Sequence, residues 1–244
     1  MSFAPALHAE LLKVRTLRSQ LGGLGAILLA TVAFSVLAAA DGSGDTAEDG
    51  FDPLFAVYFG VSFGQVAAVA FATSAVAAEF RGGALRVSLA AVPRRGRWFA
   101  AKLTAIALPV LAVGLATGFV TLAAGSAALG DGADAIGTIE GLRAAVGCGL
   151  YLTLMALFAA GLTAVLRSGV ATLSILVPFL LIVSFVVGDL SGNAADFLPD
   201  RAGQAVLHSA PQGALGPWTG LAVNALWTAA AVGAGAWRTR RRDA

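Results

Sequence analysis

The chain has 244 residues, of which 58% are hydrophobic and only 12% are charged, and its mean hydropathy is +0.82. Soluble domains are typically about a quarter charged, so this composition excludes an ordinary soluble fold. Charged residues gather in short clusters between apolar runs of about 17–25 residues, the length that crosses a bilayer. The formal net charge of +2 gives no indication of a nucleic-acid partner.

Residues 1–20 predict an amphipathic helix on the membrane surface, because apolar residues recur at helical spacing from Phe3 to Val14. A simple positively charged stop before the first span is the alternative. Residues 38–40, all Ala, imitate a signal-peptide cleavage site after the following apolar run. The leader and the run are both longer than a signal peptide has, so we expect the run to be an uncleaved span.

Six apolar runs predict transmembrane helices, so the expected fold is all-α, with residues 1–244 forming one polytopic membrane domain. The expected spans are 21–40, 54–78, 99–125, 143–166, 169–188 and 217–237. Pro109 and Pro178 lie inside spans and predict kinks there.

The loop charges predict the orientation of these spans. With six spans, every Lys and Arg except Arg143 and Arg201 falls on one side. Every acid except Glu10, Glu79 and Asp243 falls on the other side. Both termini are therefore expected in the cytoplasm, with the acidic loops, including 189–216, outside the cell.

The second expected span carries polar and aromatic residues near one face. These residues are Phe55, Tyr58, Ser62, Gln65 and Thr73. They predict a cavity for an amphipathic solute, although an interhelical hydrogen bond that only holds the bundle together is an equal alternative. Gly60 and Gly64 form a G-x-x-x-G motif that allows close helix packing.

The expected cytoplasmic segment 79–98 is rich in arginine and contains a short stretch, 84–92, that is compatible with a helix. Positive-inside topology explains the arginines, but it explains neither Glu79 at the end of the span nor the short helix. A compact, charged corner of this kind is suited to contact with a soluble partner.

The chain has no sequence signal for catalysis. No paired carboxylates, two-histidine zinc spacing or Ser/Lys pair falls within a span, and Cys148 is the single cysteine. The phosphate-binding loop ends in Gly-Lys-Ser/Thr, whereas Lys13 precedes Val14 and Lys102 precedes Leu103. We therefore expect neither an enzyme nor a proton pump, and any ATP hydrolysis must come from a separate protein.

Several motifs resemble the permease subunits of bacterial ABC exporters of the type-2, or G-type, class. In that family the second span ends in Glu-Phe/Tyr-Arg and a Gly, followed by a short coupling helix, a Pro, arginines and a Lys that opens the third span. The matching residues here are Glu79, Phe80, Arg81, Gly83, Leu85, Pro93, Arg94, Arg97 and Lys102. Ala84 departs from the pattern, since a Thr is common there.

The likeness extends along the whole chain. Glu10, Lys13 and Arg18 look like the family's elbow helix. The Leu198-Pro199 pair in the last outer loop and the basic carboxyl end, residues 240–244, are also similar to the family.

The resemblance implies a multi-pass subunit of the cell membrane that pairs with a second permease copy, as a homodimer or with a sister subunit. Each copy would dock a cytoplasmic ABC ATPase, which binds ATP and Mg, so this chain would bind no cofactor. The implied ATPase-coupling residues are Glu79, Phe80, Arg81, Gly83, Leu85, Arg86, Arg94 and Arg97. The second and fifth spans would face the cargo pathway, and residues 189–216 would form a lid over its exit.

Family members export hydrophobic or amphipathic compounds such as drugs, antibiotics and modified peptides, and that is the function the resemblance implies. Two other classes stay open: a non-transporting scaffold or immunity protein with an exporter-like fold, and an ATP-independent channel or carrier.

Overall fold

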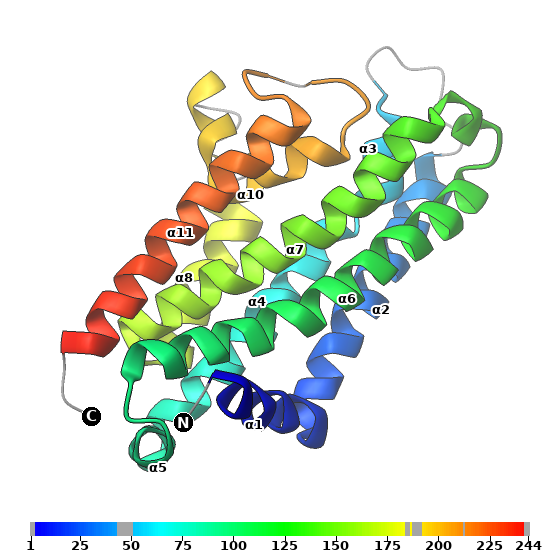
Figure 1. Cartoon of the computed structure of the whole chain (residues 1–244). Helices are drawn as coiled ribbons and strands as arrows, with labels where there is room; N and C mark the ends of the chain where they lie inside the picture. Colours follow the sequence, from blue (N-terminus) through cyan, green and yellow to red (C-terminus); the bar gives the residue numbers. More distant parts are fainter. Residues whose placement is uncertain (1–2, 43–50, 184–185, 187–191, 212, 242–244) are drawn as a thin grey trace.

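In a computed structural model the protein is a bundle of long helices, with short helices at both ends (Figure 1). The structure describes residues 3–42, 51–183, 186, 192–211 and 213–241. These ranges contain no strand, so the all-α prediction is confirmed for the described part of the chain. The elements are α1 (Phe3–Thr16), α2 (Arg18–Gly42), α3 (Pro53–Tyr58), α4 (Val61–Ala77), η1 (Ala78–Phe80), α5 (Ala84–Ala91), α6 (Arg95–Leu129), η2 (Gly130–Ala135), α7 (Thr138–Leu166), α8 (Gly169–Pro178), η3 (Phe179–Val183), η4 (Gly192–Phe197), α10 (Pro199–Gln204), η5 (Ala205–Leu207) and α11 (Pro217–Arg241).

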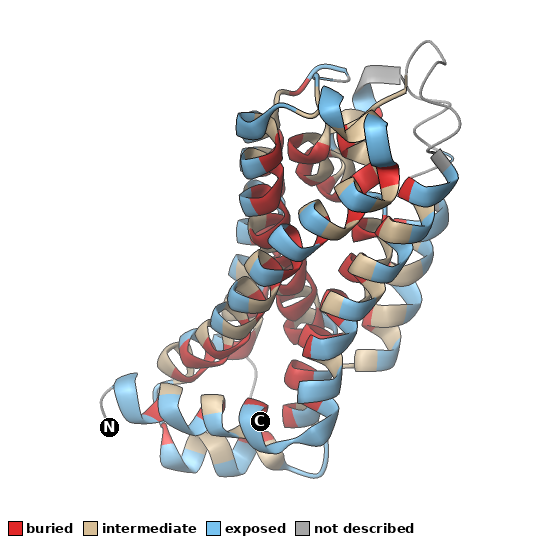
Figure 2. Cartoon of the chain, turned by 90° about the vertical axis from the view of Figure 1, so that its right-hand side faces the viewer, coloured by how far each residue is buried: buried red, intermediate tan, exposed pale blue. Residues whose placement is uncertain are grey.

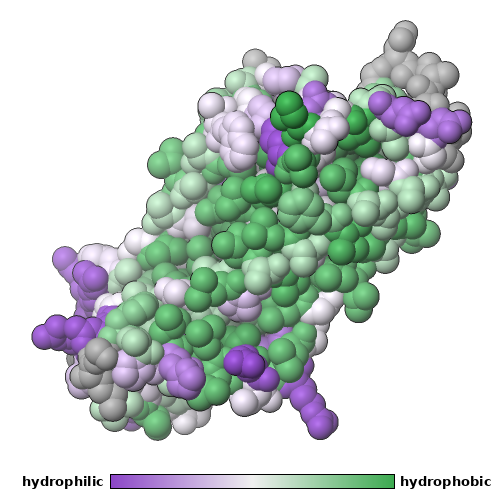
Figure 3. Space-filling view, turned by 45° about the vertical axis from the view of Figure 1, so that its right-hand side comes forward, coloured by the Kyte–Doolittle hydropathy of each residue, from purple (hydrophilic) through white to green (hydrophobic). Residues whose placement is uncertain are grey.

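Five helical segments are long and apolar enough to cross a membrane. They are Arg18–Asp41, Pro53–Phe80, Arg95–Ala135, Thr138–Leu166 and Pro217–Arg241. The surface of the bundle agrees, because hydrophobic side chains cover its middle and hydrophilic ones gather toward its ends (Figure 3). Five of the six expected spans therefore correspond to apolar helices of membrane-spanning length.

The expected span 169–188 is only partly described. Its apolar helix runs over Gly169–Ile182, which is shorter than a full span. Pro178 ends α8, and the π-helical turn η3 follows, because a proline offers no N–H and its ring crowds the preceding turn. Residues 184–185 and 187–188 lie outside the described residues, so the sixth span stays a prediction.

Other expectations also fall partly outside the described residues. These are the outer acids Asp45, Glu48, Asp49 and Asp189, the first residues of the lid at 189–191, its residue 212, and the carboxyl end at 242–244.

Several helices are longer than their apolar runs. The third span was expected at 99–125, but α6 occupies Arg95–Leu129, and α11 continues to Arg241. A charged residue ends a hydropathic run without ending a helix, because Lys and Arg are good helix formers that extend into headgroups or water. Hydropathy therefore underestimated the helix lengths.

The bundle has two different ends. α1 and α5 lie at one end together with the carboxyl end of α11, and we call this the α5 end (Figure 1). α10 and the start of α3 lie at the opposite end, which we call the α10 end. Buried residues face the interior of the bundle, and exposed residues cover its outside (Figure 2).

Small residues let the long helices approach closely. The N–H of Gly60 donates to Ser35 Oγ at 3.0 Å, and a Cβ at Gly60 would collide with the carbonyl oxygen of Thr31 in α2. A Cβ at Gly118 of α6 would likewise collide with Ala145 of α7. These contacts confirm close packing at both sites.

Replacing Gly60 by Ala should lower the stability of the bundle by about 1–3 kcal/mol, the usual cost of overpacking a core. Thermal unfolding of the purified protein in detergent micelles measures this loss. Gly25→Ala is the matched control, because a Cβ at Gly25 in α2 meets nothing within 4 Å. Equal unfolding temperatures for the two variants would show that α2 and α4 are not in this close contact.

Candidate functional site

Four charged side chains meet in a buried cluster at the α5 end. Lys102 Nζ lies 2.7 Å from Glu79 Oε1 and also forms an ion pair with Glu10. Lys13 Nζ lies 2.9 Å from Glu79 Oε1 and 2.9 Å from Glu10 Oε1. Ser88 Oγ donates to the other oxygen of Glu79 at 2.9 Å. We call these five residues the charge cluster.

The charge cluster joins four elements that are distant in sequence. Glu10 and Lys13 come from α1, Glu79 from η1 at the end of the second span, Ser88 from α5 and Lys102 from α6. Two carboxylates oppose two ammonium groups, so the charges balance. The carboxylates and Lys102 are almost fully buried, and buried charges persist only when they are paired.

Lys13 is the half-exposed member of the cluster, with 43% of its side chain accessible. Burial opposes the charge of its ammonium group, but hydrogen bonds to Glu79 and Glu10 outweigh that effect and raise the pKa of Lys13. It therefore stays cationic, and the cluster keeps its balance at physiological pH.

Two glycines allow α5 to fold back onto the cluster. Gly82 and Gly83 have φ values of +58° and +76°, a left-handed conformation that suits glycine. This turn reverses the chain between η1 and α5, and it brings Ser88 to the carboxylate of Glu79.

A hollow of about 390 Å³ opens beside α5. Its lining residues are Glu79, Phe80, Gly83, Leu85, Arg86 and Arg167. Five of these residues belong to the expected coupling set, and the structure brings them together. The guanidinium carbon of Arg167 lies 5.7 Å from the ring centroid of Phe80, a cation–π contact.

The other expected coupling and elbow residues lie outside this hollow. Arg81 and Arg94 are exposed at the surface of the same end, and Arg97 is half-buried in the first turn of α6. Arg18 is exposed at the start of α2, whereas Glu10 and Lys13 of α1 belong to the charge cluster. The coupling role of these residues stays a prediction.

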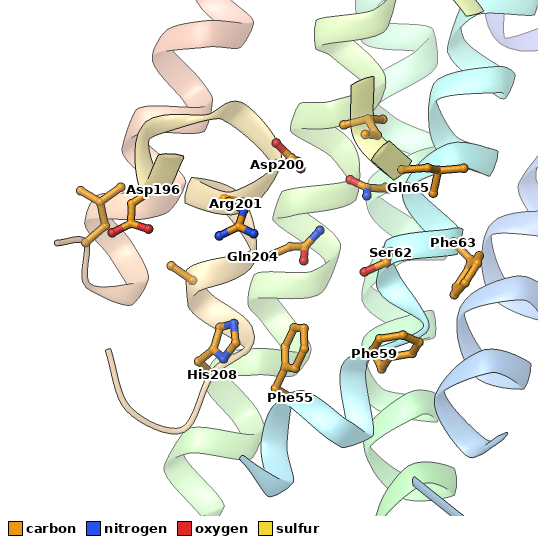
Figure 4. Close-up of a pocket in the computed structure, with 14 residues that line it drawn as sticks. Phe55, Phe59, Ser62, Phe63, Gln65, Asp196, Asp200, Arg201, Gln204 and His208 are labelled. Atoms are coloured by element: carbon orange, nitrogen blue, oxygen red, sulfur yellow. The ribbon is translucent and has the colours of Figure 1, made fainter. Parts of the chain in front are cut away.

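A second cavity, of about 420 Å³, lies at the α10 end and is called here the outer pocket (Figure 4). α3, α4, η3, η4 and α10 contribute to its wall, together with Ala205, His208 and Leu215. Phe55, Ser62 and Gln65 line it, as expected for a pathway face. Gln65 is held in place by the hydroxyl of Tyr151, which in turn accepts a hydrogen bond from Gln204 Nε2 at 3.1 Å.

Two other expected pathway residues are placed in helix contacts instead. The hydroxyl of Tyr58 donates to the carbonyl oxygen of Gly118 at 2.9 Å, and the side chain is fully buried. Thr73 is also buried, and its hydroxyl lies 3.5 Å from that of Thr163. For these two residues the geometry matches the alternative of an interhelical hydrogen bond.

A carboxylate holds His208, one of the lining residues of the outer pocket. Asp52 caps α3 by accepting from the N–H groups of Leu54 and Phe55, both at 3.1 Å. It also accepts from the N–H and hydroxyl of Ser209 and lies 2.9 Å from His208 Nδ1. Asp52 therefore joins the start of the second span to the segment before α11.

Hydrogen bonds set the charge of Asp52. Burial alone would raise the pKa of this carboxyl, but hydrogen bonds from His208, Ser209 and the N–H of Phe55 outweigh burial and lower the pKa to about 2. Asp52 is therefore ionised under all physiological conditions.

Sequence reasoning gave no role to several of these residues. Lys102 enters the sequence analysis only through the family pattern and the absent phosphate-binding loop, and no motif there includes Ser88, Arg167 or His208. A basic residue just inside an apolar run is a weak sequence signal for Lys102. No signal marked His208, because its partner Asp52 lies 156 positions away.

No family model, no curated protein and no solved structure matches the chain in the comparisons made. Among the described residues, no three His, Cys, Asp or Glu side chains gather in a way that could hold a metal ion. The geometry of the charge cluster and of the outer pocket therefore carries the functional argument.

Lys102→Met should destabilise the protein by about 3–5 kcal/mol, because it leaves two buried carboxylates facing each other with only Lys13 between them. Lys13→Met should cost clearly less, since Lys13 is 43% exposed and Lys102 still bridges both carboxylates. Chemical unfolding of both variants in the same detergent measures the difference. If Lys102→Met and Lys13→Met lowered the free energy of unfolding by small and equal amounts, the charge cluster would not be buried and balanced as described.

The stability of the folded protein should depend on pH through the carboxyl group of Asp52. Its pKa is lower in the folded state than the ordinary 3.8, so its contribution is complete above about pH 4 and disappears as the pH falls through about 2. Asp52→Asn should therefore lower the unfolding temperature at pH 6 but much less at pH 2. Asp131→Asn, an exposed acid in η2, serves as the control. An equal loss at both pH values would exclude the ionised carboxylate as the cause.

Proposed function

We propose that this protein is the membrane subunit of an ATP-driven exporter that moves a hydrophobic or amphipathic compound out of the cell. Each copy would pair with a second permease copy and dock a cytoplasmic ABC ATPase, which binds ATP and Mg. The observation that carries the proposal is the charge cluster, which ties α5 to the ends of two long apolar helices and to α1.

The charge cluster supports coupling because its buried ion pairs resist separation, so the elements that carry them are expected to move together. A push on α5 reaches Glu79 through Ser88, and from Glu79 it reaches Lys102 of α6 and Lys13 of α1. Moving one of these elements alone would separate buried charges, which is costly. A force applied at the surface of the α5 end would therefore move the helices together.

The outer pocket supports the other half of the proposal. Segment Pro53–Phe80 includes Phe55, Ser62 and Gln65 in the outer pocket and Glu79 in the charge cluster. A shift of this one segment would change both sites at once. The proposed orientation places the α5 end and both termini in the cytoplasm and the outer pocket on the external side, with the sixth span completed by residues 169–188.

Coupling also needs a partner that distinguishes two conformations. Taking a population from 1:99 to 99:1 requires about 5.5 kcal/mol of differential binding. Closure of two ATPase subunits on ATP would supply it, and this chain would convert it into opening of the outer pocket.

Protein purified from native membranes should retain an ABC-type ATPase, and Arg81→Ala should reduce the retained ATPase about tenfold, equivalent to about 1.4 kcal/mol of docking energy. Arg81 is exposed beside the hollow, so the variant should still fold. Quantitative mass spectrometry of the purified complex measures the ratio of ATPase to permease.

Arg15→Ala is the matched control, since Arg15 is an exposed cation of α1 at the same end. A wild-type protein that retains no ATPase would support the scaffold or immunity class instead. Cargo flux that survives complete removal of nucleotide would support an ATP-independent carrier.

A further inference from the structure

Aromatic rings form a continuous ladder along the outer pocket. Phe34 of α2 stacks on Phe63 of α4, with ring centroids 4.0 Å apart. Phe59 lies 6.1 Å from Phe63 and 6.3 Å from Phe55 in edge-to-face contacts. The imidazole of His208 closes the ladder by stacking on Phe55 at 4.3 Å. Every rung except Phe34 lines the pocket.

The carboxylate of Asp52 fixes the imidazole of His208 that stacks on Phe55. Phe59 is 39% exposed, although aromatic side chains usually bury most of their area. The protein therefore leaves part of the Phe59 ring uncovered beside the pocket.

The described residues of the lining include two carboxylates, Asp196 and Asp200, and two basic side chains, the guanidinium of Arg201 and the imidazole of His208. Asp196 comes from η4, whereas Asp200 and Arg201 come from α10, across the pocket from Phe59 and Phe63 (Figure 4). Asp52 adds a further negative charge behind His208.

We propose that the outer pocket binds an aromatic organic cation, with its rings against the phenyl ladder and its charge facing Asp196 and Asp200. This inference rests on the proposed export function and names the class of cargo. Aromatic faces carry negative charge density and attract cations most strongly where water is excluded. The volume of about 420 Å³ fits a drug-sized compound, since ligand pockets range over about 300–1,000 Å³.

Tetraphenylphosphonium and tetraphenylborate provide the test, because they share one shape and differ in the sign of their charge. Equilibrium dialysis against purified protein in micelles, corrected with empty micelles, should give at least tenfold tighter binding of the phosphonium. No nucleotide and no ATPase is needed, so the result is independent of whether an ATPase co-purifies.

Variants locate the site. Asp196→Asn preserves the oxygen that accepts from the N–H of Ala214 and removes only the charge, so it should weaken phosphonium binding severalfold and leave borate binding unchanged or stronger. Phe59→Leu should weaken binding of both ions. Asp131→Asn, in η2, which contacts α3 but lies outside the pocket, should change neither.

Three outcomes would overturn the inference. They are equal or tighter binding of the borate, which would assign the pocket to anions through Arg201; no binding of either ion; and phosphonium binding that neither pocket variant alters. If the phosphonium binds as expected but no ATPase co-purifies, the cargo class stands as a ligand class and the export function fails.

Discussion

The structure depends most on the pairing of Glu79 with Lys102 in an almost dry environment. A carboxylate or an ammonium group removed from water needs a partner of opposite charge. This constraint favours the packing of α1 against α6 and of α5 against the end of the second span, because Lys102 pairs with both Glu10 and Glu79, and Ser88 donates to Glu79. The short helices α1, η1 and α5 are therefore held together by the contacts of the charge cluster.

At the α10 end, too, an ionised side chain is held by several partners. Asp52 collects hydrogen bonds from two N–H groups of α3 and from His208 and Ser209, so one ionised side chain joins segments that are far apart in the chain. Between the two polar ends, small residues such as Gly60 and Gly118 let long helices touch.

Much of the architecture could be predicted, and the misses have identifiable causes. Of the five residues grouped on the second span, Phe55, Ser62 and Gln65 line the outer pocket. Tyr58 was grouped with them on the assumption of one continuous helix. The structure places the Tyr58 hydroxyl against α6 and places Ser62 and Gln65 in the outer pocket, so helical spacing alone did not distinguish a pocket residue from a helix contact.

By itself, the sequence determined that the chain is helical and built around long apolar segments, because hydropathy and residue spacing are local properties. It also determined which residues are charged and where they sit along the chain. Only the tertiary structure decided which charges meet: Glu10 with Lys102, and Asp52 with His208. Such pairs form only when whole helices pack together. Burial of both partners makes the pairs strong, and the order of residues in the sequence does not show which partners will be buried together.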